Sequence, residues 1–198
     1  MAILFDEILT QGIRAGKIPA REQSAKNWYR ETAKTYKRVN EGQLLRADRD
    51  RLRSRPIIGN MYMFMYDPKL KAELPYYDTF PLIFPIKSAK GGFLGINLHY
   101  LPLNFRATLM DALYGTVTND VYDESTKLKI SYDILNSASK FRYFKPCIKH
   151  YLRSQFRSRF LYIYPSEWDI ALFLPLARFQ KASKSTVYAD SRKIIRNS

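Results

Sequence analysis

Two sets of basic side chains recur at intervals of four residues. The N-terminal basic stripe comprises Lys26, Arg30, Lys34 and Arg38; the C-terminal basic stripe comprises Lys145, Lys149, Arg153 and Arg157, with Arg159 just beyond it. Residues four apart lie on one face of a helix, so each set predicts a nearly straight basic row. Such a row can neutralise the phosphates of a nucleic-acid backbone without reading its bases. One row alone is equally well explained as a solvated helix face, but two rows favour a surface that binds a polyanion.

Aromatic rings are the second candidate for binding chemistry. Tyr76, Tyr77 and Trp168 lie in predicted turns, and Trp28 and Tyr29 lie beside the N-terminal basic stripe. Basic rows bind the phosphates of any nucleic acid alike, because they make no contact with the bases. An aromatic ring can add a contact to an exposed base, and such stacking contributes roughly 1–3 kcal/mol. We therefore expect Tyr76, Tyr77 and Trp168 to be possible base-stacking residues.

Catalytic and metal-binding patterns are weak in this sequence. His99 and His150 lack the spacing of metal ligands, and His99 is interpreted as a hydrogen-bonded core or edge residue. Asp67-Pro68-Lys69 has the Asp-x-Lys form of some metal-dependent nuclease cores, but a turn that ends a strand explains it better. The single cysteine, Cys147, is expected to be a small buried apolar group. No catalytic residue, metal, cofactor or small-molecule substrate is predicted.

The elements that position these side chains form an α+β fold. Short apolar runs bounded by turn residues predict strands at residues 61–66, 81–87, 93–100 and 159–164. Ser88 to Gly92 forms a turn in which glycine can adopt positive φ. Together the strands predict a small, strongly bent β-sheet resembling an SH3-like barrel, with packed helices at both ends of the chain.

Helices are predicted from apolar periodicity and from residues that begin or end a helix. They cover residues 1–15, 19–39, 104–114, 125–136 and 145–157, and the basic tail after residue 178 is expected to add another. Gly115 is expected to end the third of these helices, which starts at residue 104. The resulting organisation is a basic helical N-terminal region (1–55), a main α+β domain (56–182) and a basic C-terminal tail (183–198).

The net charge of +15 is concentrated at the two ends of the chain. Residues 1–55 carry 13 basic and 7 acidic groups, and residues 140–198 carry 13 and 3, whereas the apolar centre is nearly neutral. This segregation favours a polyanionic partner, with nucleic acid ahead of an anionic membrane. The longest apolar run is far shorter than the roughly 20 residues that span a bilayer. An acidic protein surface remains the alternative partner.

Five segments resemble a family of small virion proteins of T-even-like tailed bacteriophages. They read GNMYMFMYDPK, LPYYDTFPLIFPI, GGFLGINLHYLP, FKPCIKHYL and PSEWDIALFLP, and they span most of residues 57–182. The resemblance implies the DNA end-protector family, whose members bind the ends of the packaged double-stranded genome and shield them from host exonuclease. It further implies a non-enzymatic protein found in the virion and in the host cytoplasm, beside other virion proteins.

The resemblance also leaves one alternative function open. A structural protein of the neck, baseplate or tail assembly of a contractile-tailed phage has the same size and the same lack of a catalytic constellation. The resemblance implies no particular binding residues, so the candidate DNA-binding residues remain those of the two basic stripes.

Overall fold

The computed structural model describes residues 4–19, 22–117, 133 and 142–197. The helix expected at residues 125–136 lies almost wholly outside these described residues. Three helices precede a run of five strands, and the remaining helices and strands follow, so the predicted α+β class is confirmed.

Six strands form one antiparallel sheet in the order β1-β7-β2-β4-β5-β6. Their bounds are β1 Leu52–Arg53, β2 Met61–Met63, β4 Leu82–Ala89, β5 Gly92–Asn97, β6 Ile148–Leu152 and β7 Phe160–Ile163. The four predicted strand positions are confirmed. The SH3-like barrel is wrong, because β1 and β6 form two separate edges and the sheet stays open. A separate two-stranded ribbon pairs β3, Tyr77–Asp78, with β8, Phe179–Gln180.

The β4–β5 hairpin depends on two adjacent glycines. Gly91 has φ of +75°, a left-handed conformation that glycine adopts without steric cost. A side chain at Gly92 would place its Cβ 1.8 Å from the carbonyl oxygen of Tyr151 in β6. The first glycine makes the predicted turn, and the second lets β6 approach closely enough to pair with β5.

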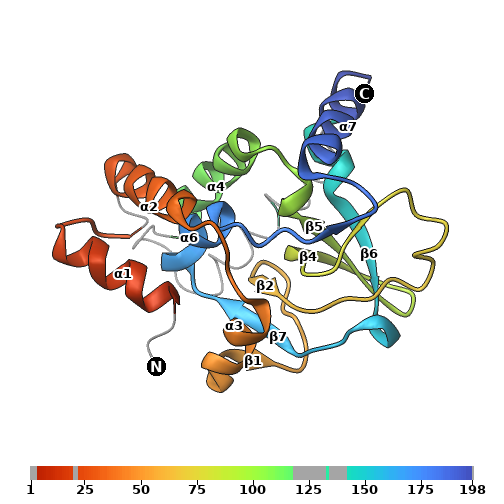
Figure 1. Cartoon of the computed structure of the whole chain (residues 1–198), viewed down its shortest axis with the longest axis horizontal. Helices are drawn as coiled ribbons and strands as arrows, with labels where there is room; N and C mark the ends of the chain where they lie inside the picture. The colour runs from red at the N-terminus through yellow and green to blue at the C-terminus, as the bar shows by residue number, and fades with distance from the viewer. Residues whose placement is uncertain (1–3, 20–21, 118–132, 134–141, 198) are drawn as a thin grey trace.

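Six helices surround the sheet in the described part of the chain. They are α1 Leu4–Arg14, α2 Gln23–Thr35, α3 Glu41–Ala47, α4 Leu103–Val117, α6 Trp168–Phe173 and α7 Lys184–Arg196. Short 3₁₀ helices cover Arg49–Arg51, Leu98–Tyr100, Arg142–Cys147, Arg153–Gln155 and Pro165–Glu167. Helices α1, α2, α4 and α6 gather at one end of the molecule, and α7 lies at the other, near the start of β6 (Figure 1). Helix α4 continues through Gly115, so the predicted helix end there is wrong.

Helix α6 lies at the centre of the core, since all six of its residues are buried. Phe84 of β4 meets Trp168 edge to face, with ring centroids 5.1 Å apart. The same core includes Phe5 and Ile8 of α1. The N-terminal region therefore shares one hydrophobic core with the sheet. The three-part domain division itself stays a prediction.

The predicted helix at residues 145–157 is wrong. This segment forms the end of a 3₁₀ helix, strand β6 and a further 3₁₀ turn. β6 pairs with β5 from Ile148 opposite Ile96 to Leu152 opposite Gly92. Isoleucine and tyrosine in this segment suit a pleated surface, and pairing with a neighbouring strand outweighs the four-residue recurrence of charge.

Candidate nucleic-acid interface

The N-terminal basic stripe turns into the protein at its centre. Arg30 is buried; its Nε donates to Asp169 Oδ1 at 2.6 Å and its Nη2 to Asp111 Oδ1 at 2.7 Å. Because a helix has 3.6 residues per turn, each four-residue step rotates the row by about 40°. The interpretation of Arg30 as a phosphate-facing residue is therefore wrong: its guanidinium neutralises two carboxylates of α4 and α6.

The rest of that stripe is divided between helix packing and solvent. Lys26 lies 3.6 Å from Asp111 and 4.8 Å from the ring centroid of Tyr114. Lys34 pairs with Glu31 at 2.6 Å. Helix α2 ends at Thr35, so Arg38 lies beyond it in an exposed connection. The predicted straight row of four is not formed.

The C-terminal basic stripe is spread over a strand and its flanking turns. Lys145, Arg153, Arg157 and Arg159 are exposed, and Arg157 lies 3.5 Å from Asp67. Lys149 is the half-buried member, in β6. Because the helix is absent, these cations do not share one helical face, but all lie in or near the sheet edge formed by β6 and its turns.

A hollow lined by five tyrosines lies against β6 and the β3–β8 ribbon. We call it the tyrosine hollow; its volume is about 200 Å³. Its lining comprises Tyr66, Pro68, Leu74, Tyr76, Tyr77, Asp78, Asn97, Tyr100, Lys149, His150 and Tyr151. The hollow brings together Lys149 from the C-terminal basic stripe and two of the three predicted stacking residues. Its volume is below the roughly 300–1,000 Å³ of sites that enclose a whole small molecule, so it suits one flat group.

Lys149 is an unneutralised cation in this hollow. Its Nζ lies 4.1 Å from the ring centroid of Tyr100, and no carboxylate pairs with it among the described residues. Burial lowers the pKa of the Lys149 ammonium, although the nearby Cys147 thiol acts in the other direction. A desolvated ammonium that only an aromatic face stabilises favours the arrival of an anion.

The three predicted stacking rings have different environments. The Tyr76 ring already contacts Tyr100 and Phe179, at centroid distances of 6.0 and 6.4 Å. Tyr77 is partly exposed and makes no ring contact with the described aromatic residues. Trp168 is 2 % exposed and donates from Nε1 to the Ile163 carbonyl, so the prediction that it lies in an accessible turn is wrong. Tyr77 is the predicted ring that remains open to a base.

The buried carboxylate of Asp78 lies in the lining of the tyrosine hollow and accepts several hydrogen bonds. Asp78 accepts from the backbone N–H groups of Phe80 and Arg178 and from the Asn97 amide, and it meets His99 Nδ1 at 2.7 Å. Burial raises the pKa of Asp78, but the contacts with His99, the Phe80 N–H and the Asn97 amide outweigh it, so the pKa is lowered. Burial and the nearby Arg106 lower the pKa of His99, so a neutral imidazole donates from Nδ1 to an ionised Asp78. His99 is thus the hydrogen-bonded core residue that was expected.

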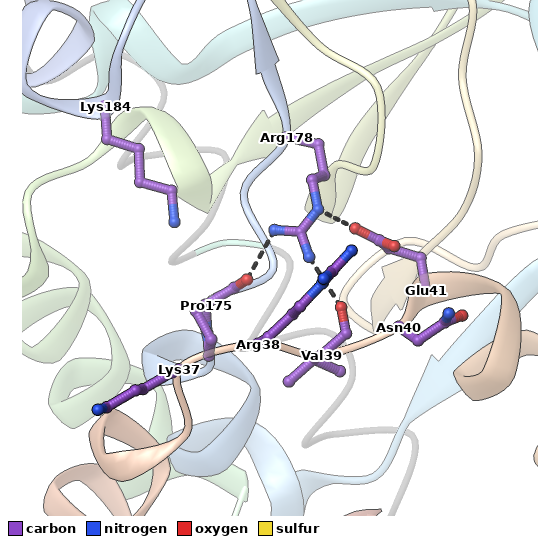
Figure 2. A pocket seen from close by; sticks show the side chains of 8 residues that line it. All are labelled: Lys37, Arg38, Val39, Asn40, Glu41, Pro175, Arg178 and Lys184. Carbon is purple, nitrogen blue, oxygen red and sulfur yellow. Dashed lines mark hydrogen bonds and ion pairs between the residues drawn. The ribbon is translucent and has the colours of Figure 1, made fainter.

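Two further hollows form a series with the tyrosine hollow, in which each shares lining residues with the next. The arginine hollow, about 420 Å³, shares Tyr66 with the tyrosine hollow and is lined also by Arg157, Arg178 and Gln180. The basic hollow, about 280 Å³, shares Glu41 and Arg178 with the arginine hollow. Figure 2 shows the basic hollow, which lies between the α2–α3 connection and the start of α7.

Comparison with known proteins identifies the family. The family described as phage T4 terminal DNA protecting protein matches residues 5–198 of the chain. The chain belongs to that family. No curated protein and no solved structure matches it. Because the match covers nearly the whole chain, the predicted family and the predicted protection of phage DNA ends are confirmed. The description of the family names protection of DNA and no chemical reaction.

Other sites expected from the sequence have structural roles in this member of the DNA-protecting family. Asp67 is partly exposed and pairs with Lys71 at 2.8 Å and with Arg157, as expected for a turn that follows a strand. Cys147 is a free, buried thiol whose pKa is raised by burial. Within the described residues, no group of three or more His, Cys, Asp or Glu could hold a metal ion, and no helix is long and apolar enough to cross a membrane.

Several residues that line the tyrosine hollow and the basic hollow were not found from the sequence. They are Tyr66, Tyr100, His150, Tyr151, Lys37, Arg178 and Lys184. The available signal was the number of tyrosines, 15 in 198 residues. Which of them share a hollow depends on pairing between distant strands, and no local pattern reports that pairing.

Proposed function

We propose that the protein protects DNA ends by holding the terminal nucleotide at the tyrosine hollow. The observation that carries this proposal is Lys149, a desolvated ammonium that pairs with no carboxylate of the described residues and lies over Tyr100 in a hollow that Tyr77 also lines. The terminal base stacks on the open Tyr77 ring, and the phosphodiester that links it to the next nucleotide approaches Lys149 and His150. Duplex interior cannot use this site, because its bases are stacked on both faces and offer no free π surface.

The exposed cations beside the hollow supply affinity that does not depend on the end. Arg153, Arg157 and Arg159 follow Lys149 along the chain and are exposed. They contact the phosphates of the last turns of the duplex, which gives binding that weakens steeply with salt. An exonuclease is excluded because the nucleotide that it must engage is covered. In this proposal the protein contacts other virion proteins in the particle and is present in the host cytoplasm after DNA entry.

Competition between linear and circular duplexes of equal length tests the proposal. Wild-type protein is expected to prefer the linear form and to protect it from exonuclease. Tyr77→Ala removes one stacking ring, worth roughly 1–3 kcal/mol, so the preference for ends should fall about 5- to 150-fold while binding to circles is kept. Tyr164→Ala is the matched control, since Tyr164 is 41 % exposed and lines none of the three hollows.

Two results would contradict the proposal. Equal binding of wild-type protein to linear and circular duplex, without protection of ends, would favour a structural role in the neck or tail. Equal loss of end preference in the Tyr77 and Tyr164 variants would remove the tyrosine hollow from the binding site.

A further inference from the structure

The basic hollow carries a charge that the proposed stacking site does not use. Its lining includes the cations Lys37, Arg38, Arg178 and Lys184 and one carboxylate, Glu41, which leaves three net positive charges around about 280 Å³. These cations come from three separate segments: the α2–α3 connection, the stretch before β8 and the first residue of α7. Arg38, Arg178 and Lys184 converge on one concavity, whereas Lys37 extends away from it (Figure 2).

Arg178 is the fixed member of this cluster. Its Nε pairs with Glu41, Nη1 donates to the Pro175 carbonyl at 2.7 Å, and Nη2 donates to the Val39 carbonyl at 2.8 Å. These contacts use most of its donors and join the α2–α3 connection to the segment before β8 (Figure 2). Arg178 therefore shapes the wall of the hollow and contributes positive potential.

The other cations have free donors. Arg38 and Lys184 form no hydrogen bond or ion pair with the described residues, and Figure 2 shows the Lys184 amine and the Arg38 guanidinium directed toward Arg178, while Lys37 extends away. Burial and the positive charges of Arg178 and Arg106 lower the pKa of Lys184. The N-terminus of the 13-residue helix α7 adds a partial positive charge at the same place.

We propose that the basic hollow binds a terminal phosphate monoester of a DNA end. Convergent cations around a concavity match a compact group with three terminal oxygens and up to two negative charges, because several donors can reach it at once. A backbone phosphodiester has one charge and two free oxygens, and it suits cations spaced along a surface. The inference rests on the proposed function only in taking DNA as the molecule that carries the phosphate.

Three otherwise identical linear duplexes test this: one with 5′-phosphates, one with 3′-phosphates and one with hydroxyls at both ends. A phosphate at the correct terminus is expected to tighten binding roughly tenfold, as for one charge-assisted set of hydrogen bonds. Lys184→Gln and Arg38→Gln should bring that ratio close to one. Lys193→Gln removes one charge from an exposed position of the same helix, outside the hollow, and should retain the ratio. Millimolar inorganic phosphate should suppress the ratio in the wild-type protein.

The outcomes separate this inference from the proposed function. If the three duplexes bind equally while all outcompete a circle, the phosphate site is refuted and the end-binding function stands. If Lys184→Gln weakens binding to circles as much as to phosphorylated ends, the hollow contacts backbone phosphates and the inference is overturned. If circles compete as well as linear duplexes, the proposed function has failed.

Discussion

Arg30→Met discriminates between the sequence-based and the structural account of the N-terminal basic stripe. Arg30 and Asp169 have side chains only 7 % and 3 % exposed, with Nε and Oδ1 2.6 Å apart. Removing the guanidinium leaves a buried carboxylate without its cation, which costs about 3–5 kcal/mol. For a chain of this length each kcal/mol lowers Tm by roughly 2–4 °C, so we expect a decrease of about 6–20 °C.

Thermal unfolding followed by circular dichroism measures this decrease. Lys34→Met is the matched control, because it removes one charge from the same helix, and its side chain is 39 % exposed and paired with the exposed Glu31. Exposed pairs contribute roughly 0–1 kcal/mol, so its Tm should change little. Replacing Asp169 by leucine in the Arg30→Met background removes the stranded carboxylate and should recover much of the loss.

The pH dependence and the DNA affinity complete the test. Burial already raises the pKa of Asp169, and Arg30 opposes that effect. Without Arg30 the pKa rises further, so the variant's deficit should shrink as pH falls and Asp169 takes up a proton. Affinity for DNA, measured well below the variant's Tm, should equal that of the wild type. An unchanged Tm together with weakened DNA binding would refute the structural account and restore Arg30 to a phosphate-binding role.

Two further predictions concern the elements that hold the tyrosine hollow. In the folded protein the pKa of His99 lies below its ordinary value of 6.5, so His99 is neutral. As pH decreases through 6.5, the unfolded chain takes up a proton at His99 that the folded protein does not, and the urea midpoint should fall. His99→Gln should flatten this dependence of the urea midpoint between about pH 5 and 8. His150→Gln, at an exposed position, should retain it. A flat dependence in the His150 variant and an unchanged one in the His99 variant would contradict the assignment to His99. Gly92→Ala should lower the free energy of unfolding by about 1–3 kcal/mol or more and weaken end preference, because its Cβ would displace β6. Gly42→Ala in α3, where the nearest atoms are 3.4 Å away, should be nearly neutral, and an equal effect of the two substitutions would contradict the close-approach argument.

The sequence located the strands better than the helices that carry charge. The runs at residues 61–66, 81–87, 93–100 and 159–164 are apolar on both faces, and only a strand within a covered sheet uses such a short run well. These runs did not determine whether the sheet closes into a barrel. Whether strands close into a barrel depends on pairing between the first and last of them, and β1 and β6 instead each pair on one side only.

Charge periodicity was the weaker guide to the site. At Arg30 it identified the helix but not the face, since Asp111 and Asp169 lie far along the chain and make burial of a cation favourable. At Lys149 it selected a residue of the proposed base site for a wrong reason, because the predicted helix is strand β6. Convergence of Lys149 with Tyr77 arises from tertiary pairing, which sequence spacing does not encode.

The two proposed sites share one structural support. Asp78 lines the tyrosine hollow, and its Oδ1 accepts from the backbone N–H of Arg178, whose guanidinium lines the basic hollow. The β3–β8 ribbon that contains Asp78 therefore fixes the position of the base site relative to the phosphate site. If both proposals hold, one DNA end can engage both hollows at once. The four donors to the Asp78 carboxylate offset the cost of its burial and hold two backbone segments in register.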